Sequence, residues 1–218
     1  MNFERFVNDP PQTPYAPTWD FRVGTYKCDD IDVKSLSQFL LSKEREVKKL
    51  PVTKIGNEYF DGYTGLGINS TTSRSCDYNI LTWKHPELKK LKTNIIKNIF
   101  AYNGKCGNET PSELYAICWY NILRFRQKIK PHLHSAQSDC YLSGHFNVQV
   151  KDTSTCYMSP VNQLNNPDIM EMKNEEGKMT LFPSYILHYT TRHNSFKPRI
   201  TIAFDISYFK FHNNYTRL

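Results

Sequence analysis

The sequence predicts an α+β domain in which helices come first and a run of short strands follows. Apolar residues recur at helical spacing in residues 33–49 and 86–102, whereas the segments after residue 113 are short, apolar and bounded by turn residues. A chain of 218 residues, 39% of them hydrophobic, can bury one substantial core. We therefore expect one domain, whose strands close into a barrel or a sandwich.

The chain divides into an N-terminal arm and this domain. Residues 1–20 are rich in proline and show no periodic apolar pattern, so we expect an irregular arm there. The domain then covers residues 21–218. Supporting helices and strands are expected in residues 21–112, and the barrel core in residues 113–209.

Each predicted element has a local signal. Asp32 can cap the first helix and Pro51 ends it, while Pro86 suits the first turn of the second helix. Between them, the glycine-rich residues 60–74 predict a shaped loop, and their spacing fits no nucleotide-binding loop. A polar loop is expected over residues 103–112. The predicted strands cover residues 21–28, 114–125, 141–151, 178–182, 188–191 and 199–209.

Charge and composition exclude some classes of protein and permit others. A net charge of +7 permits contact with a polyanion, but the basic residues concentrate in segments 43–49 and 84–97, where solvated helix faces are the simpler interpretation. The first residues lack the apolar run of a signal peptide, and no segment reaches membrane-spanning length, so we expect a soluble cytoplasmic protein. The six cysteines form no C-x-x-C pair and are expected to stay reduced.

Five of the seven histidines lie in residues 130–146 and 182–204. On extended backbone His132 and His134 would project from one face, as two neighbouring metal ligands must. A third ligand has to come from elsewhere, and His188 stands in an apolar stretch where a surface histidine is not expected. The other histidines are expected to be ordinary hydrogen-bonded residues: His85, His145, His193 and His212.

The alternating segment R-I-T-I-A-F places Arg199 and Thr201 on one face of a core strand. A guanidinium directed into the core requires an anionic partner, and a carboxylate offers the geometry that arginine prefers. Either a ligand or a structural Asp or Glu could supply that carboxylate. Asn121 shares its strand face with large core residues and is a further candidate for the same interior.

These motifs together resemble a known family. The segments W-Y-N-I-L, K-P-H-L-H, L-S-G, G-K-M-T-L-F-P-S-Y-I-L-H and P-R-I-T-I-A-F occur in the order of the Fe(II)/2-oxoglutarate-dependent dioxygenases. More narrowly, they resemble the prolyl-hydroxylase-like members found in marine bacteriophages and bacteria. The resemblance covers residues 61–206. It implies a double-stranded β-helix, a jelly-roll or cupin-like core with the N-terminal helices packed on its major sheet.

The resemblance also implies cofactors and roles for individual residues. His132 and His188 would bind Fe(II), Arg199 would bind the distal carboxylate of 2-oxoglutarate with help from Thr201, and Asn121 would add a hydrogen bond. The family has Asp or Glu where this chain has His134, so the third ligand is His134, a water molecule or Asp139. Three histidines would also suit zinc.

The sequence is compatible with several functions. The leading hypothesis is a hydroxylase that uses 2-oxoglutarate and O2, with a protein side chain, a nucleobase or a small metabolite as its substrate. The alternative is a catalytically inactive cupin-like metal-binding or structural phage protein. A third hypothesis is a nucleic-acid-binding accessory protein that uses residues 84–97, and its binding would weaken steeply with salt.

Overall fold

The computed structural model describes residues 1–161 and 168–218 of the chain. The two α-helices are α1 (Val33–Val47) and α2 (Pro86–Cys106), and two 3₁₀ turns are η1 (Thr72–Arg74) and η2 (Ile80–Thr82). The strands are β1 (Asn2–Asn8), β2 (Trp19–Lys27), β3 (Lys54–Ile55), β4 (Glu58–Tyr59), β5 (Tyr115–Leu123), β6 (Leu142–Gln149), β7 (Ser154–Met158), β8 (Ile169–Lys173), β9 (Lys178–Pro183), β10 (His188–Thr190), β11 (Arg199–Ser207) and β12 (Thr216–Arg217).

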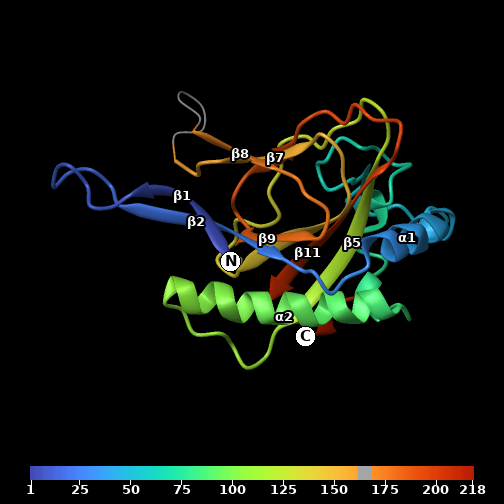
Figure 1. The fold of residues 1–218 in the computed structure, drawn as a ribbon, viewed down its shortest axis with the longest axis horizontal. Helices are drawn as coiled ribbons and strands as arrows, with labels where there is room; N and C mark the ends of the chain where they lie inside the picture. Colours follow the sequence, from blue (N-terminus) through green and yellow to red (C-terminus); the bar gives the residue numbers. More distant parts are fainter. Residues whose placement is uncertain (162–167) are drawn as a thin grey trace.

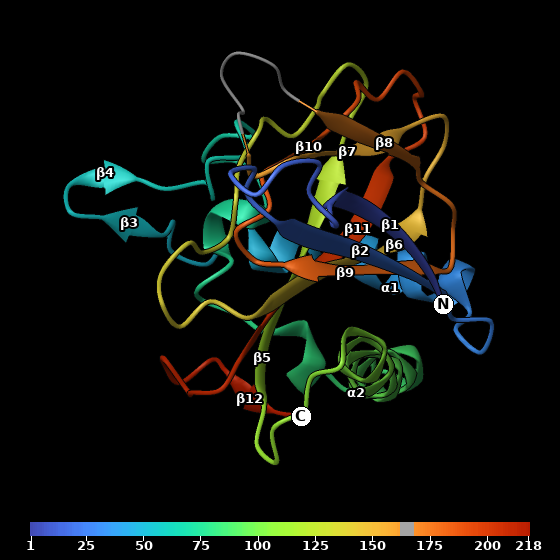
Figure 2. The same ribbon diagram turned by 90° about the vertical axis from the view of Figure 1, so that its left-hand side faces the viewer.

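Most strands belong to two antiparallel sheets. The larger sheet has the order β1-β2-β9-β6-β11-β5-β12, and the smaller one has the order β10-β7-β8. Figure 1 shows the smaller sheet on one side of the larger sheet and α2 on the other side. The short β3-β4 hairpin projects from the body in Figure 2. This arrangement confirms the α+β class, with helices packed on the larger sheet.

Strand β11 separates the two interiors of the molecule. Its residues Ile200, Ile202 and Phe204 are fully buried in the core that the helices share with the larger sheet. The alternate residues, including Arg199 and Thr201, line the space between the two sheets. Because side chains alternate across a strand, one face of β11 stabilises the fold and the other serves a site.

The helices follow their predicted signals closely. Asp32 accepts hydrogen bonds from the backbone N–H groups of Lys34 and Ser35, both at 3.0 Å, and α1 starts at the next residue. Helix α2 continues to Cys106, so the loop predicted to begin at residue 103 is wrong over its first residues. Gly107 ends this helix with φ 74°, a left-handed conformation that glycine adopts freely. Neither helix of the described ranges is long and apolar enough to cross a bilayer.

The irregular arm predicted for residues 1–20 is wrong, because residues 2–8 form β1 and pair along their whole length with β2. The prolines are confined to the turn between these strands, and Phe6 is buried beside Val23. Figure 1 shows the hairpin extending away from the rest of the molecule. All six predicted strands are present with ends shifted by up to two residues, namely β2, β5, β6, β9, β10 and β11, whereas β7 and β8 were not predicted.

Candidate metal centre and cosubstrate pocket

A cavity of about 590 Å³ lies between the two sheets. Strands β5, β6 and β11 supply its floor, β10 and residues 129–134 supply one wall, and the glycine-rich loop from Phe60 borders it. All six residues predicted for the site line this cavity: Asn121, His132, His134, His188, Arg199 and Thr201.

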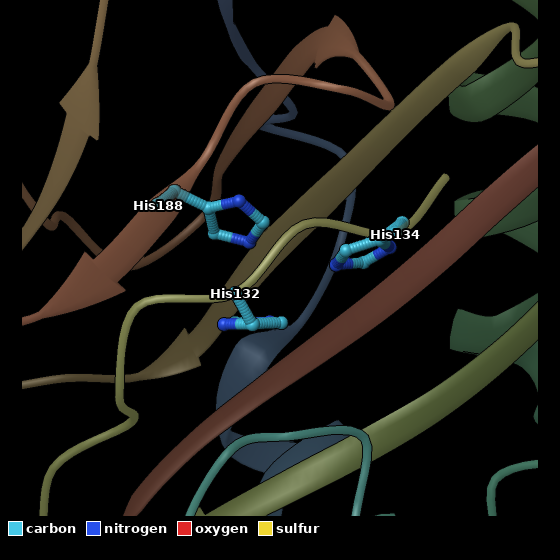
Figure 3. A group of neighbouring side chains, drawn as sticks. All are labelled: His132, His134 and His188. Carbon is cyan, nitrogen blue, oxygen red and sulfur yellow. The ribbon is translucent and has the colours of Figure 1, made fainter. Parts of the chain in front are cut away.

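Three of the predicted histidines form one cluster. One ligand atom from each of His132, His134 and His188 lies within 4.8 Å of the other two, a spacing that could hold a metal ion. Figure 3 shows the three rings next to one another, with His188 reaching from β10 and the other two from the segment before β6. Among the described residues, Asp139 is exposed and does not join this cluster.

His132 and His134 do not lie on a regular strand, which corrects the expectation of extended backbone. Instead, His132 forms an isolated bridge with His188, whose backbone N–H···O distances are 3.0 and 2.9 Å. The backbone N–H of His134 donates to the carbonyl of Ser184 at 3.0 Å. These bonds fix a loop against β10, so segments more than fifty residues apart in sequence present their imidazoles to the same point.

The hydrogen bonds of the three rings select one tautomer. His132 Nδ1 lies 2.9 Å from the carbonyl of Lys130, and His188 Nδ1 lies 3.0 Å from that of Ile186. His134 Nδ1 is bonded to a carboxylate oxygen of Asp205. Since each partner is an acceptor, each Nδ1 carries the proton, and each Nε2 keeps a lone pair for a metal.

Burial also keeps His132 and His188 neutral. Desolvation and, to a smaller extent, neighbouring His134 lower the pKa of His132 to about 4. Desolvation likewise holds the pKa of His188 well below its usual range. At neutral pH both rings are therefore uncharged, which is the form that binds a metal.

Arg199 lines the same cavity and has no acidic partner among the described residues. The residue is 2% exposed, and its guanidinium donates from Nε to Thr153 Oγ1 at 3.2 Å and from Nη1 to Thr201 Oγ1 at 3.4 Å. Burial lowers the pKa of Arg199 to about 10, so the group still carries its charge at neutral pH. No salt bridge among the described residues includes it. The structural salt bridge considered above is thus absent from the described part of the chain, and the pocket fits an anionic ligand.

Asn121 lies beside this anion pocket. It pairs directly with Thr201 across β5 and β11, and its Oδ1 accepts a hydrogen bond from Thr72. The amide NH2 is then the group that can donate to a ligand.

Two further polar residues of the cavity were not predicted for the site. Asp205 bonds His134 from β11, and the alternation that placed Arg199 and Thr201 inward also places Asp205 inward. His145 was expected to be an ordinary histidine; it is not in the metal cluster but lines the cavity, with Nε2 2.8 Å from Tyr157 Oη. Among the described residues its buried Nδ1 has no hydrogen-bond partner, and burial lowers the pKa of His145 to about 3.

Comparisons with known proteins agree with this chemistry. Residues 117–205 match a family described as "Putative 2OG-Fe(II) oxygenase". The fold is similar to that of a Pseudomonas putida prolyl-4-hydroxylase, with TM-score 0.52 and 12% identity over 85% of this chain and 92% of that one. It is also similar to a Trichoplax adhaerens prolyl hydroxylase in complex with a peptide of hypoxia inducible factor, with TM-score 0.54 and 12% identity over 85% and 83% of the two chains.

A third similar structure is the carbocyclase SnoK of nogalamycin biosynthesis, with TM-score 0.54 and 9% identity over 85% of this chain and 79% of that one. No curated protein matches the chain significantly. The structural similarities confirm the double-stranded β-helix, and the family match covers the segments that carry the cluster and the arginine. The chain thus has a double-stranded β-helix fold, and its residues 117–205 are similar to the 2OG-Fe(II) oxygenases.

Proposed function

We propose that the chain is an Fe(II)- and 2-oxoglutarate-dependent oxygenase. We propose that His132, His134 and His188 hold Fe(II) through their Nε2 atoms. The arrangement of protons supports this ligand set, because all three Nδ1 atoms are occupied by acceptors and all three Nε2 atoms are free. We further propose that Arg199 and Thr201 bind the distal carboxylate of 2-oxoglutarate, and that Asn121 donates to the same cosubstrate. The buried guanidinium without an acidic partner is the observation that carries the second assignment.

The protein orients the reactants, supplies the positive charge of Arg199 and excludes water from the cavity. When bound, iron and 2-oxoglutarate supply the oxidising chemistry, in which O2 is consumed and the cosubstrate is converted to succinate and CO2. Arg199 would hold the distal carboxylate of the cosubstrate, and the three imidazoles would hold the metal. Ile129, Phe182 and Leu187 line the cavity with apolar side chains, which exclude water and strengthen these electrostatic interactions.

As substrate we propose a side chain of a peptide or protein. Phe60, Tyr63 and Leu133 line the cavity, and Tyr63 and Leu133 are 66% and 37% exposed. Exposed aromatic and aliphatic groups at a mouth suit an extended peptide, whose apolar side chains they can cover. The prolyl hydroxylases with a similar fold, one of them bound to a peptide, support the same class.

Anaerobic titration tests the cosubstrate assignment. We expect wild-type protein with Fe(II) and 2-oxoglutarate to develop a metal-to-ligand charge-transfer band and, once O2 is admitted, to form succinate. Arg199→Ala should weaken binding of 2-oxoglutarate at least tenfold, because a charge-assisted pair of about 1.5–3 kcal/mol is lost. Arg192→Ala is the matched control, since Arg192 is exposed and does not line the cavity.

The outcomes separate the remaining functions. A wild-type protein that binds metal but shows no band and forms no succinate would favour the inactive cupin-like alternative. For the substrate class, proline-containing peptides should gain the mass of one oxygen atom during turnover. Gain of oxygen by nucleosides instead of peptides would contradict the peptide proposal.

A further inference from the structure

We infer that Asp205 is the carboxylate of this metal centre, and that it acts through His134 instead of binding the metal itself. The inference rests on the ligand set proposed above. The family's usual ligand set contains one carboxylate, which this chain lacks at position 134. The structure instead brings a carboxylate from β11 to the far side of the imidazole that takes this place.

The contact between the two residues is enclosed and directional. Asp205 accepts the proton of His134 Nδ1, and the side chains of His134 and Asp205 are 7% and 26% exposed. With Nδ1 bound in this way, Nε2 is the only ring nitrogen that can bind a metal. Asp205 is not part of the three-histidine cluster, so the described geometry makes it a partner of a ligand.

A second hydrogen-bond network holds Asp205 in position. Ser143 Oγ donates to Asp205 Oδ1 at 2.6 Å and lies 2.9 Å from Ser184 Oγ. Ser184 in turn accepts the backbone N–H of His134 through its carbonyl oxygen. The same three residues therefore fix both the ring and the backbone of His134, and Ser143 is completely buried.

Asp205 differs chemically from the acceptors of the other two ligands. His132 and His188 each donate to a neutral backbone carbonyl, whereas His134 donates to a carboxylate. A carboxylate forms the stronger hydrogen bond and makes the imidazole a better electron donor to the metal. The centre thereby regains a negative charge close to the metal, on the same strand face as the positive Arg199.

Metal binding by Asp205→Asn tests the inference without turnover. We expect Co(II) and Mn(II) to bind this variant about 10- to 100-fold more weakly than wild type, by calorimetry, with a changed Co(II) ligand-field spectrum. Asp77→Asn is the control, because it removes the same charge at an exposed position near the cavity that makes no contact with His134. Wild-type affinity in Asp205→Asn would overturn the inference.

A double-mutant cycle shows whether Asp205 acts through the ring. In the His134→Ala background, Asp205→Asn should cause no further loss of affinity, because the group through which it acts is gone. His134→Asp should restore tight binding by supplying a carboxylate ligand, and this binding should be insensitive to Asp205→Asn. Equal losses in all backgrounds would overturn the inference, since Asp205 would then act independently of His134.

Two measurements keep the test valid if the variant is unstable. Thermal unfolding of the metal-free proteins shows whether Asp205→Asn is folded. If it is not, Ser143→Ala serves in its place, since it keeps the carboxylate and removes one hydrogen bond that orients it. We expect Ser143→Ala to lower metal affinity two- to about tenfold, and to cause no loss of affinity in the His134→Ala background. Unchanged affinity in Ser143→Ala would then overturn the inference. Failure of wild type to bind metal would instead contradict the proposed ligand set.

Discussion

Arg199 is a charged side chain whose direct partners are uncharged. Its hydrogen bonds in the described chain go to the hydroxyls of Thr153 and Thr201, at 3.2 and 3.4 Å. A buried charge without a counter-charge reduces the stability of a fold, so evolution retains it only for a purpose such as binding an anion. Arg199 thus lowers the stability of the fold and in return binds the cosubstrate.

Replacing Arg199 with methionine should reveal this cost. We expect Arg199→Met to raise the free energy of unfolding of the ligand-free protein by about 1–4 kcal/mol, as when buried charges are replaced by apolar side chains of similar size. The same variant should lose the rise in melting temperature that 2-oxoglutarate gives wild type. Denaturant unfolding with and without 2-oxoglutarate measures both effects. A destabilised variant would show instead that Arg199 is mainly structural.

The residues that could be predicted are those with a signal in their immediate sequence. His132, His134 and His188 stand out by spacing or by an apolar setting, and Arg199 by the alternation of its strand. Asp205 bonds a residue 71 positions away, a pairing that no local pattern contains. The alternation of side chains along the strand places Asp205 on the inward face with Arg199 and Thr201. An inward-facing Asp in a barrel strand therefore indicates a site residue.

At the scale of elements, the helices were predictable and the smaller sheet was not. Asp32 and Pro86 mark helix starts through local chemistry, so the sequence predicts those starts to the residue. Strands β7 and β8 have five residues each. They are stabilised by pairing with each other, and β7 also pairs with β10. Because such pairing depends on distant segments, the sequence predicted only β10 of that sheet.

Gly144 shows how closely two elements approach beside the site. A Cβ added there would lie 2.5 Å from both the Phe204 ring and the backbone oxygen of Thr180. We therefore expect Gly144→Ala to destabilise the protein by about 1–3 kcal/mol through overpacking, and to weaken metal binding by displacing the neighbouring Ser143. Gly104→Ala is the control: no atom lies within 4 Å of its added Cβ, and a helical alanine should stabilise α2 by about 0.5–1 kcal/mol. Equal melting temperatures for the two variants would contradict this packing.

At the scale of the whole molecule, the fold concentrates unusual titration behaviour in one cavity. Burial lowers the pKa values of His132, His145 and His188, and each of them lines the space between the sheets. Residues of both sheets line this cavity, so its desolvation is a property of the complete fold. The stability of the protein should therefore depend on pH through these three groups together.

The sign of this dependence follows from which state binds protons. In the unfolded chain these histidines take up protons near pH 6.5, whereas in the folded protein His132 and His145 do so only near 4 and 3. The unfolded state thus binds more protons from about pH 6.5 down to the folded pKa values near 4 and 3. Stability is complete well above pH 6.5 and falls as the pH is lowered through that range. His145→Gln should make stability depend less on pH.

Bound Mn(II) should raise the melting temperature of wild type and of His145→Gln, by less at pH 5 than at pH 7.5, because protons compete for Nε2 of the ligands. Melting curves of the metal-free and Mn(II)-loaded proteins across this range measure both trends, and a metal effect that is independent of pH would contradict histidine ligation.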